Sequence, residues 1–90
     1  MINYKNMYRV KIITTQDGLW EAIYIDGKLI EEGHILGEGN SRFFLLEKAE
    51  EFKFKRSDVK VYETNDEDEK TLQIYGDFPL LLCNLKGTYE

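Results

Sequence analysis

An Asp-Gly pair between two runs of β-branched and aromatic residues constrains this fold more than any other feature of the sequence. Asp26 and Gly27 separate the run 20–25 from the run 28–30. This pair favours a two-residue type I′ turn, because both central positions of that turn need a positive φ. The sequence therefore predicts a β-hairpin centred on Asp26-Gly27.

A second Asp-Gly pair, Asp17-Gly18, follows a predicted first strand over 8–15. If both turns hold two residues, the chain forms a three-stranded antiparallel meander that ends near Glu32 and places Ile12 opposite Ile23. One face of this meander is then the predicted core face, with Val10, Ile12, Ile23, Ile25 and Ile30.

The opposite face of the predicted meander carries large apolar side chains as well. Period-two alternation places Tyr24 there, with Trp20 and Leu29 nearby, and sets Arg9 beside Asp26. Aromatic side chains exposed on a sheet suit the docking of another protein. We therefore predict Trp20, Tyr24 and Leu29 as anchors of a partner-binding surface.

A main helix is predicted over about 41–54, after a glycine-rich loop over 33–39. Asn40 or Ser41 suits its N-cap, because either side chain can accept a hydrogen bond from the first turn. The expected buried stripe consists of Leu45, Leu46, Ala49 and Phe52. This leaves Phe44 on the polar side, either tucked under the loop or part of a binding patch.

The last third of the sequence predicts a second hairpin. The segments 59–63 and 71–75 alternate with period two around the acidic run 64–70. The segment 78–85 then suits either a short helix or a strand. The predicted fold is a small α+β single domain over 1–90, with an antiparallel sheet in the order β-β-β-α-β-β.

Charge and composition disfavour several classes of partner. The chain has 17 acidic and 12 basic residues and a net charge of −5, which opposes binding to nucleic acid or to an anionic membrane. One basic cluster with interleaved phenylalanines, over 52–60, is explained by the end of the main helix, where cations are favoured. No apolar run has the length of a membrane helix, and the lone Cys83 and the polar first residues predict a cytoplasmic protein.

The acidic run does not fit a metal site. Asp66, Glu67, Asp68 and Glu69 are contiguous and enclose no glycine, whereas an EF-hand loop needs alternating ligands and a central glycine. We expect no metal and no cofactor. The run is predicted to be a solvated hairpin tip that steers a basic partner toward the protein.

His34 is the single histidine and carries the rival hypothesis. With Glu31, Glu32 or Glu38 it would serve a small-ligand-binding protein or an enzyme, completed in a dimer. The simpler interpretation places His34 in the turn at Gly33, hydrogen-bonded to the backbone.

No catalytic constellation accompanies these features, so the predicted function is a non-catalytic, acidic protein-binding module. An exposed strand edge also makes a homodimer an expectation. In size and charge the chain resembles small phage-encoded inhibitors of host defence nucleases, some of which imitate DNA. That resemblance implies an anti-defence inhibitor of a nucleic-acid-binding or defence protein, although no motif in the sequence carries it.

Overall fold

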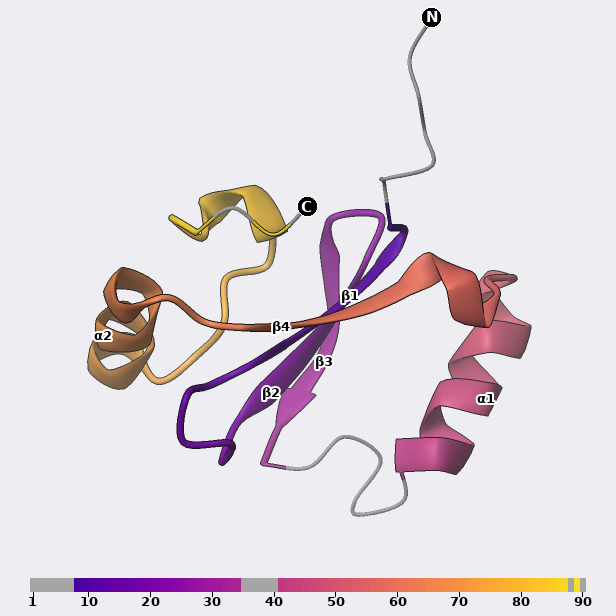
Figure 1. Ribbon diagram of the computed structural model, residues 1–90, viewed down its shortest axis with the longest axis horizontal. Coiled ribbons are helices and arrows are strands. Elements are labelled where there is room, and N and C mark those ends of the chain that lie inside the picture. Colours follow the sequence, from indigo (N-terminus) through magenta and orange to yellow (C-terminus); the bar gives the residue numbers. More distant parts are fainter. Residues whose placement is uncertain (1–7, 35–40, 88, 90) are drawn as a thin grey trace, which may run out of the picture.

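The computed structural model describes residues 8–34, 41–87 and 89, with the backbone alone for 41–43. It confirms the predicted α+β class, with a four-stranded sheet and two helices (Figure 1). In chain order the elements are β1 (Val10–Thr14), β2 (Glu21–Ile25), β3 (Lys28–Gly33), α1 (Ser41–Phe52), the 3₁₀ turn η2 (Arg56–Asp58), β4 (Val59–Glu63), α2 (Asp66–Tyr75) and the 3₁₀ turn η3 (Leu82–Asn84).

The sheet is mixed, so the prediction of an antiparallel sheet is wrong in this detail. Its strand order is β3-β2-β1-β4, and β4 runs parallel to β1. Tight turns join the antiparallel strands β1, β2 and β3. The chain then passes through α1 before it reaches β4, and a connection of that length can start a new strand at the same end of the sheet.

The Asp26-Gly27 hairpin is confirmed. Both residues have a positive φ, 53° and 82°, as a type I′ turn requires. The upstream turn is longer than predicted, because the hydrogen bond from Thr15 N to Trp20 O, at 2.9 Å, encloses residues 16–19. The longer turn shortens each of the two strands by one residue. Because both strands shorten equally, the predicted register of β1 with β2 is kept.

A β-bulge changes the register of the second hairpin. Tyr24 lies opposite Leu29, whereas Ile23 lies opposite Glu31 and not opposite Ile30 as predicted. The extra residue on β3 is Ile30, which still packs against buried residues of the predicted core face, among them Val10 and Ile12. A bulge adds one residue to one strand and increases the local twist.

The helix α1 covers the predicted core face of the sheet. The core on this side consists of Val10, Ile12, Ile23, Ile25, Phe44 and Phe54. Phe44 is only 9% exposed, so it is a core residue and not part of a binding patch. The predicted burial of Leu46 is wrong, because it is 62% exposed on the solvent side of α1. The proposed N-cap residue Asn40 lies outside the described residues.

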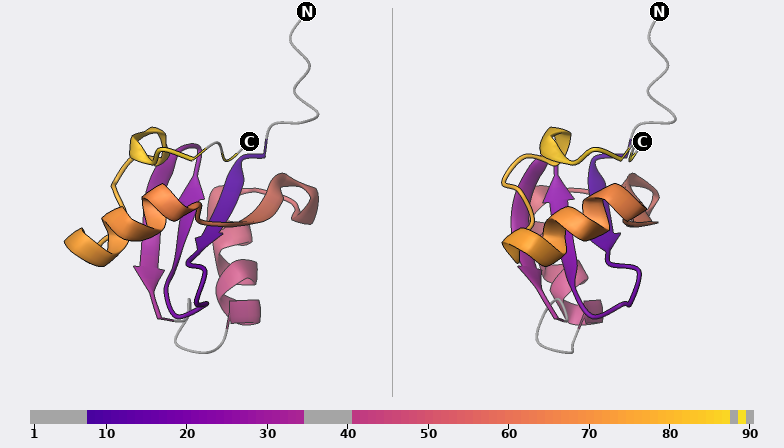
Figure 2. Two further views of the ribbon diagram at one scale, coloured as in Figure 1. Left: turned by 60° about the vertical axis from the view of Figure 1, so that its left-hand side comes forward. Right: turned by 90° about the vertical axis from the view of Figure 1, so that its left-hand side faces the viewer.

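The other face of the sheet is covered by α2 and by residues 77–87 with Tyr89, here called the C-terminal segment (Figure 2). The predicted strand over 71–75 is therefore wrong, because these residues belong to α2. Asn65 caps this helix by accepting a hydrogen bond from Asp68 N at 2.8 Å, and Gly76 ends it with a φ of 79°. Four carboxylates in its first turn match the positive end of the helix dipole.

The C-terminal segment combines the two alternatives expected for 78–85. It forms the 3₁₀ turn η3, and Leu81 makes an isolated antiparallel bridge to Lys28 at the start of β3. A second core lies on this side of the sheet, and the segment contributes Phe78, Leu85 and Tyr89 to it. The other members of the second core are Ile13, Ala22, Tyr24 and Leu72. Three layers result, with the sheet between α1 on one side and α2 with the C-terminal segment on the other (Figure 2).

Candidate functional site

Two of the three predicted anchor residues, Tyr24 and Leu29, contact the C-terminal segment. Tyr24 is 0% exposed, and its hydroxyl donates to Pro79 O at 2.6 Å. Leu29 N donates to Leu80 O at 2.8 Å, and Trp20 is half-buried beside the second core. The expectation that this face is open to a partner is therefore wrong. Its occupant is the protein's own chain.

Burial also fixes the chemistry of the Tyr24 hydroxyl. It raises the pKa of that phenol well above its ordinary value, and the nearby carboxylate of Glu32 adds to the increase. Tyr24 is therefore a neutral donor that holds Pro79 in place. Its role is structural in this arrangement.

The acidic run is the first turn of α2 and not a hairpin tip. Asp68 is 1% exposed, and its carboxylate accepts hydrogen bonds from Lys86 N, Gly87 N and the Tyr89 hydroxyl, each at 2.7 Å. The expectation that Asp68 is solvated is wrong. A buried carboxylate is stable only when several donors surround it, and the C-terminal segment supplies them.

Two neighbours of Asp68 also bond within the protein. Glu69 accepts from the Thr64 hydroxyl at 2.7 Å and from Gln16 N at 3.0 Å, and Asp66 accepts from Gln16 Nε2 at 2.9 Å. The two contacts of Gln16 tie the first turn of α2 to the loop between β1 and β2. Glu67 is exposed. The run therefore offers less free negative charge than its sequence suggests.

The His34 side chain contacts the β1–β2 loop. Its Nδ1 lies 3.1 Å from Leu19 O, and its ring packs edge-on against Trp20 with the centroids 4.6 Å apart. The backbone hydrogen bond expected by the simpler interpretation is present. Its proposed companion Glu32 instead accepts from Trp20 Nε1 at 3.0 Å and from Phe78 N at 3.1 Å.

The other members of the His34 hypothesis add little to it. Glu31 is exposed, and Glu38 lies outside the described residues. Among residues 8–34, 41–87 and 89, no group of three His, Cys, Asp or Glu side chains is placed to hold a metal ion. Cys83 is an exposed free cysteine.

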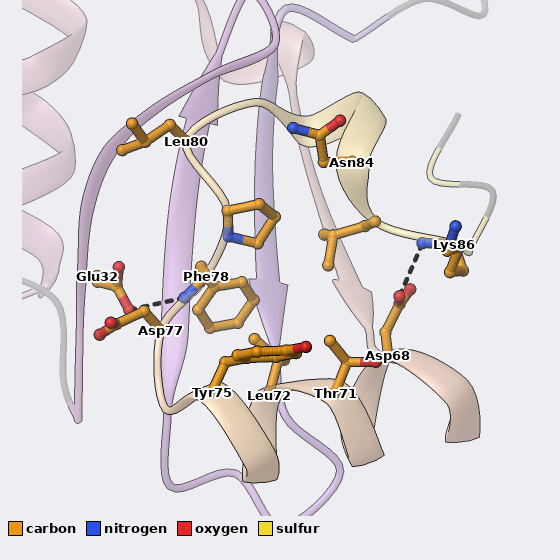
Figure 3. A pocket seen from close by; sticks show the side chains of 12 residues that line it. Glu32, Asp68, Thr71, Leu72, Tyr75, Asp77, Phe78, Leu80, Asn84 and Lys86 are labelled. Atoms are coloured by element: carbon orange, nitrogen blue, oxygen red, sulfur yellow. Dashed lines mark hydrogen bonds between the residues drawn. The ribbon is translucent and has the colours of Figure 1, made fainter.

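A groove of about 540 Å³ lies between α2 and the C-terminal segment (Figure 3). Its floor is formed by Leu72, Phe78 and Leu85, all of them buried. Tyr75 and Leu80 line the groove and are 74% and 75% exposed. The floor and the two exposed side chains form one contiguous apolar patch, and a patch is more informative about contact sites than apolar residues exposed singly.

The two ends of the groove are polar. Glu32 and Asp77 lie at one end, and Asn84 and Lys86 lie at the other (Figure 3). The Glu32 carboxylate is engaged by Phe78 N, whereas Asp77 is exposed. The groove therefore has an apolar centre and, at its rim, the exposed carboxylate of Asp77.

Sequence reasoning missed this groove because it assigned 71–75 to a strand. The signals of a helix are nevertheless present in the sequence. Asn65 precedes the acidic run as a typical N-cap, and Gly76 follows the last apolar residues as a typical helix end. Reading them as helix boundaries would have placed Tyr75 at the end of α2.

Comparisons of this chain with protein-family models, with curated proteins and with solved structures found no match. Within the residues that the structure describes, neither helix has the length and apolar character needed to cross a bilayer. The geometry of the groove is therefore the main basis for a functional proposal.

Proposed function

We propose that this protein is a non-catalytic protein-binding module and that the groove between α2 and the C-terminal segment is its binding site. The observation that carries the proposal is the exposure of Tyr75 and Leu80, 74% and 75%, beside the buried floor formed by Phe78 and its neighbours. Energetically important residues of protein interfaces are often aromatic side chains near an apolar pocket.

The open walls favour a protein segment over a small molecule. Small-ligand sites cover about 70–90% of their ligand, which needs an enclosed cavity. The exposure of Tyr75 and Leu80 leaves this groove open along one side. A peptide segment that inserts one apolar side chain would cover both walls and would keep its own backbone at the surface.

Charge favours a basic partner. The protein carries a net charge of −5, and Asp77 presents an exposed carboxylate at the rim of the groove. We propose that the bound segment places a Lys or Arg near Asp77 and an apolar side chain between Tyr75 and Leu80. Opposite charges at a rim mainly speed association and depend on salt.

Inhibition of a nucleic-acid-binding or defence protein is a specific form of this proposal. Proteins that bind nucleic acid present basic surfaces, which suits the net charge of this chain. The proposal does not need DNA mimicry by the run 66–69, because Asp68 is buried and Asp66 and Glu69 bond within the protein. The groove would then bind a basic, partly apolar segment of the inhibited protein.

Selection from a random peptide library displayed on phage tests the groove directly. We expect the immobilised protein to enrich peptides in which an apolar residue neighbours Lys or Arg. For a synthetic peptide from that selection, Leu80→Ser should weaken binding by about 2 kcal/mol, or about 30-fold. Asp77→Asn should weaken binding at low salt and have less effect at high salt.

The matched control is Leu46→Ser, because Leu46 is similarly exposed, at 62%, on the opposite side of the sheet. This variant should bind the selected peptide as the unaltered protein does. The proposal is wrong if the selection yields no basic-apolar consensus, or if Leu80→Ser and Leu46→Ser affect binding equally. Circular dichroism of each variant establishes that the fold is retained.

A further inference from the structure

A different surface, the outer edge of β4, is arranged for pairing with another strand. β4 is the last strand of the sheet, and among the described residues it pairs only with β1. Thr64 N, directly after β4, donates to Thr14 O at 3.0 Å, so the backbone of Thr64 points toward β1. Strand alternation then points the backbone groups of Val61 and Glu63 outward.

The usual protection of a strand edge is weak here. Edges are commonly blocked by proline, by a bulge or by a lysine that projects across the edge. β4 contains no proline, and its pairing with β1 has no register shift. The ammonium of Lys60 lies over two aromatic rings, 5.3 Å from the centroid of Tyr8 and 5.1 Å from that of Tyr62, and therefore does not project across the edge. Val61, at the centre of the strand, is 61% exposed.

We propose that β4 pairs antiparallel with β4 of a second copy, about a two-fold axis at Val61, so that one continuous eight-stranded sheet forms. In this register Val61 faces its own counterpart, Lys60 faces the partner's Tyr62, and Val59 faces the partner's Glu63. No like charges lie opposite each other, so the edge is complementary to itself.

The backbone groups of β4 also match this register. Val59 N–H already donates to Arg56 O, which leaves the Val59 carbonyl as an acceptor. The two Val61 residues exchange both of their hydrogen bonds, and Glu63 N–H donates to the partner's Val59 O. Directly opposed residues that exchange two bonds are the closely spaced hydrogen-bonded pairs of an antiparallel ladder.

Side chains beside the edge supply further complementarity. A groove of about 460 Å³ lies between α1 and β4 and is lined by Leu45, Leu46, Ala49, Phe54, Arg56 and Val59. In the proposed register the partner's Glu63 lies opposite Val59, on the same face as this groove. The guanidinium of Arg56 is exposed there, and neither Arg56 nor Glu63 has an ion pair within the described part of the chain. A pair between the two copies would satisfy both charges.

Light scattering and sedimentation over a ~100-fold range of protein concentration test the dimer. We expect a species of twice the chain mass of 10.6 kDa at the upper concentrations. Val61→Lys places two ammonium groups opposite each other and should raise the dimer dissociation constant by at least about 10-fold. The matched control Leu80→Ser alters an apolar residue that is at least as exposed, in the groove beside α2, and should leave the dimer unchanged.

A cysteine cross-link tests the register. In a Cys83→Ser background, Val61→Cys places two sulfurs across the axis with Cα atoms about 5.5 Å apart, within disulfide range, so mild oxidation should link the copies. Glu63→Cys is also exposed, but its two copies would lie about 14 Å apart and should not cross-link. A monomer at every concentration, a dimer indifferent to Val61→Lys, or equal cross-linking of both cysteine variants would overturn the proposal.

Discussion

The carboxylate of Asp68 in α2 accepts a hydrogen bond from the hydroxyl of Tyr89, 21 residues further along the chain, at 2.7 Å. The same carboxylate accepts from Lys86 N and Gly87 N. One buried acidic side chain therefore fastens the end of the C-terminal segment to the first turn of α2. The groove between these two elements depends on that attachment.

Asp68→Asn should destabilise the protein by about 3 kcal/mol, because the amide keeps only one acceptor oxygen and turns its NH2 group toward one of the two backbone N–H donors. Urea unfolding followed by circular dichroism measures the change. Glu67→Gln is the control, since Glu67 is exposed in the same helical turn, and it should cost no more than about 0.5 kcal/mol. Equal losses would mean that the effect belongs to the helix terminus and not to the buried contact.

Stability should fall in alkaline solution. Burial raises the pKa of Tyr24 and of Tyr89 above the ordinary value of 10.0, and the hydrogen bond to Asp68 raises that of Tyr89 further. A group with a raised pKa in the folded state contributes its stability fully below the unfolded value, and loses it as pH rises toward the folded value. The free energy of unfolding should therefore decrease above about pH 10.

The variant Tyr24→Phe separates this effect from general alkaline damage. It removes the ionisable hydroxyl, so the decline above pH 10.0 should become shallower while stability at neutral pH falls through loss of the bond to Pro79. A decline of unchanged steepness in both Tyr24→Phe and Tyr89→Phe would assign the pH dependence to other groups.

Gly27→Ala should destabilise the protein by about 1–2 kcal/mol, because an L-residue with a side chain is strained at its φ of 82°. A steric clash does not contribute to this loss of stability, since no atom lies within 4 Å of the added methyl group. Gly33→Ala is the control, because Gly33 has similar open space without a positive φ. Thermal unfolding of both variants should show a lower midpoint for Gly27→Ala alone.

Glu32→Ala should loosen the start of the C-terminal segment, because Phe78 N and Trp20 Nε1 both donate to this carboxylate. Hydrogen exchange of the Phe78 amide should accelerate by about 10-fold or more while the β1 amides keep their protection. The exposed neighbour Glu31 provides the control variant, Glu31→Ala, for which Phe78 exchange should not change. Unaltered exchange in Glu32→Ala would contradict the anchoring role.

The N-terminal half of the fold was predictable because its signals are local. The positive φ values at Asp26 and Gly27 follow from residue type, and the antiparallel pairing of Ile12 with Ile23 follows from the turn positions. The contact of Arg9 with Asp26, at 3.0 Å, follows from the same register. These features need no information from distant parts of the chain.

The candidate site was predictable only in part. The period-two alternation of 71–75 favours a strand, whereas Asn65 and Gly76 mark the two ends of a helix, and the helix is what forms. The expected exposure of Tyr24 was wrong because a distant segment covers this side chain. Tyr24 and Pro79 are 55 residues apart, and the sequence around Tyr24 carries no signal of that contact. Long-range coverage of a sheet face has to be seen in three dimensions.

The parallel pairing of β1 with β4 has a consequence for synthesis on the ribosome. Val10 meets Val59 across 49 residues, whereas Thr14 meets Glu21 across 7. The hairpin pairs can close early, but one side of β1 stays without a neighbour until β4 has been translated. The nascent chain therefore passes through a stage that is prone to self-association, and slow translation between 34 and 59 would prolong it.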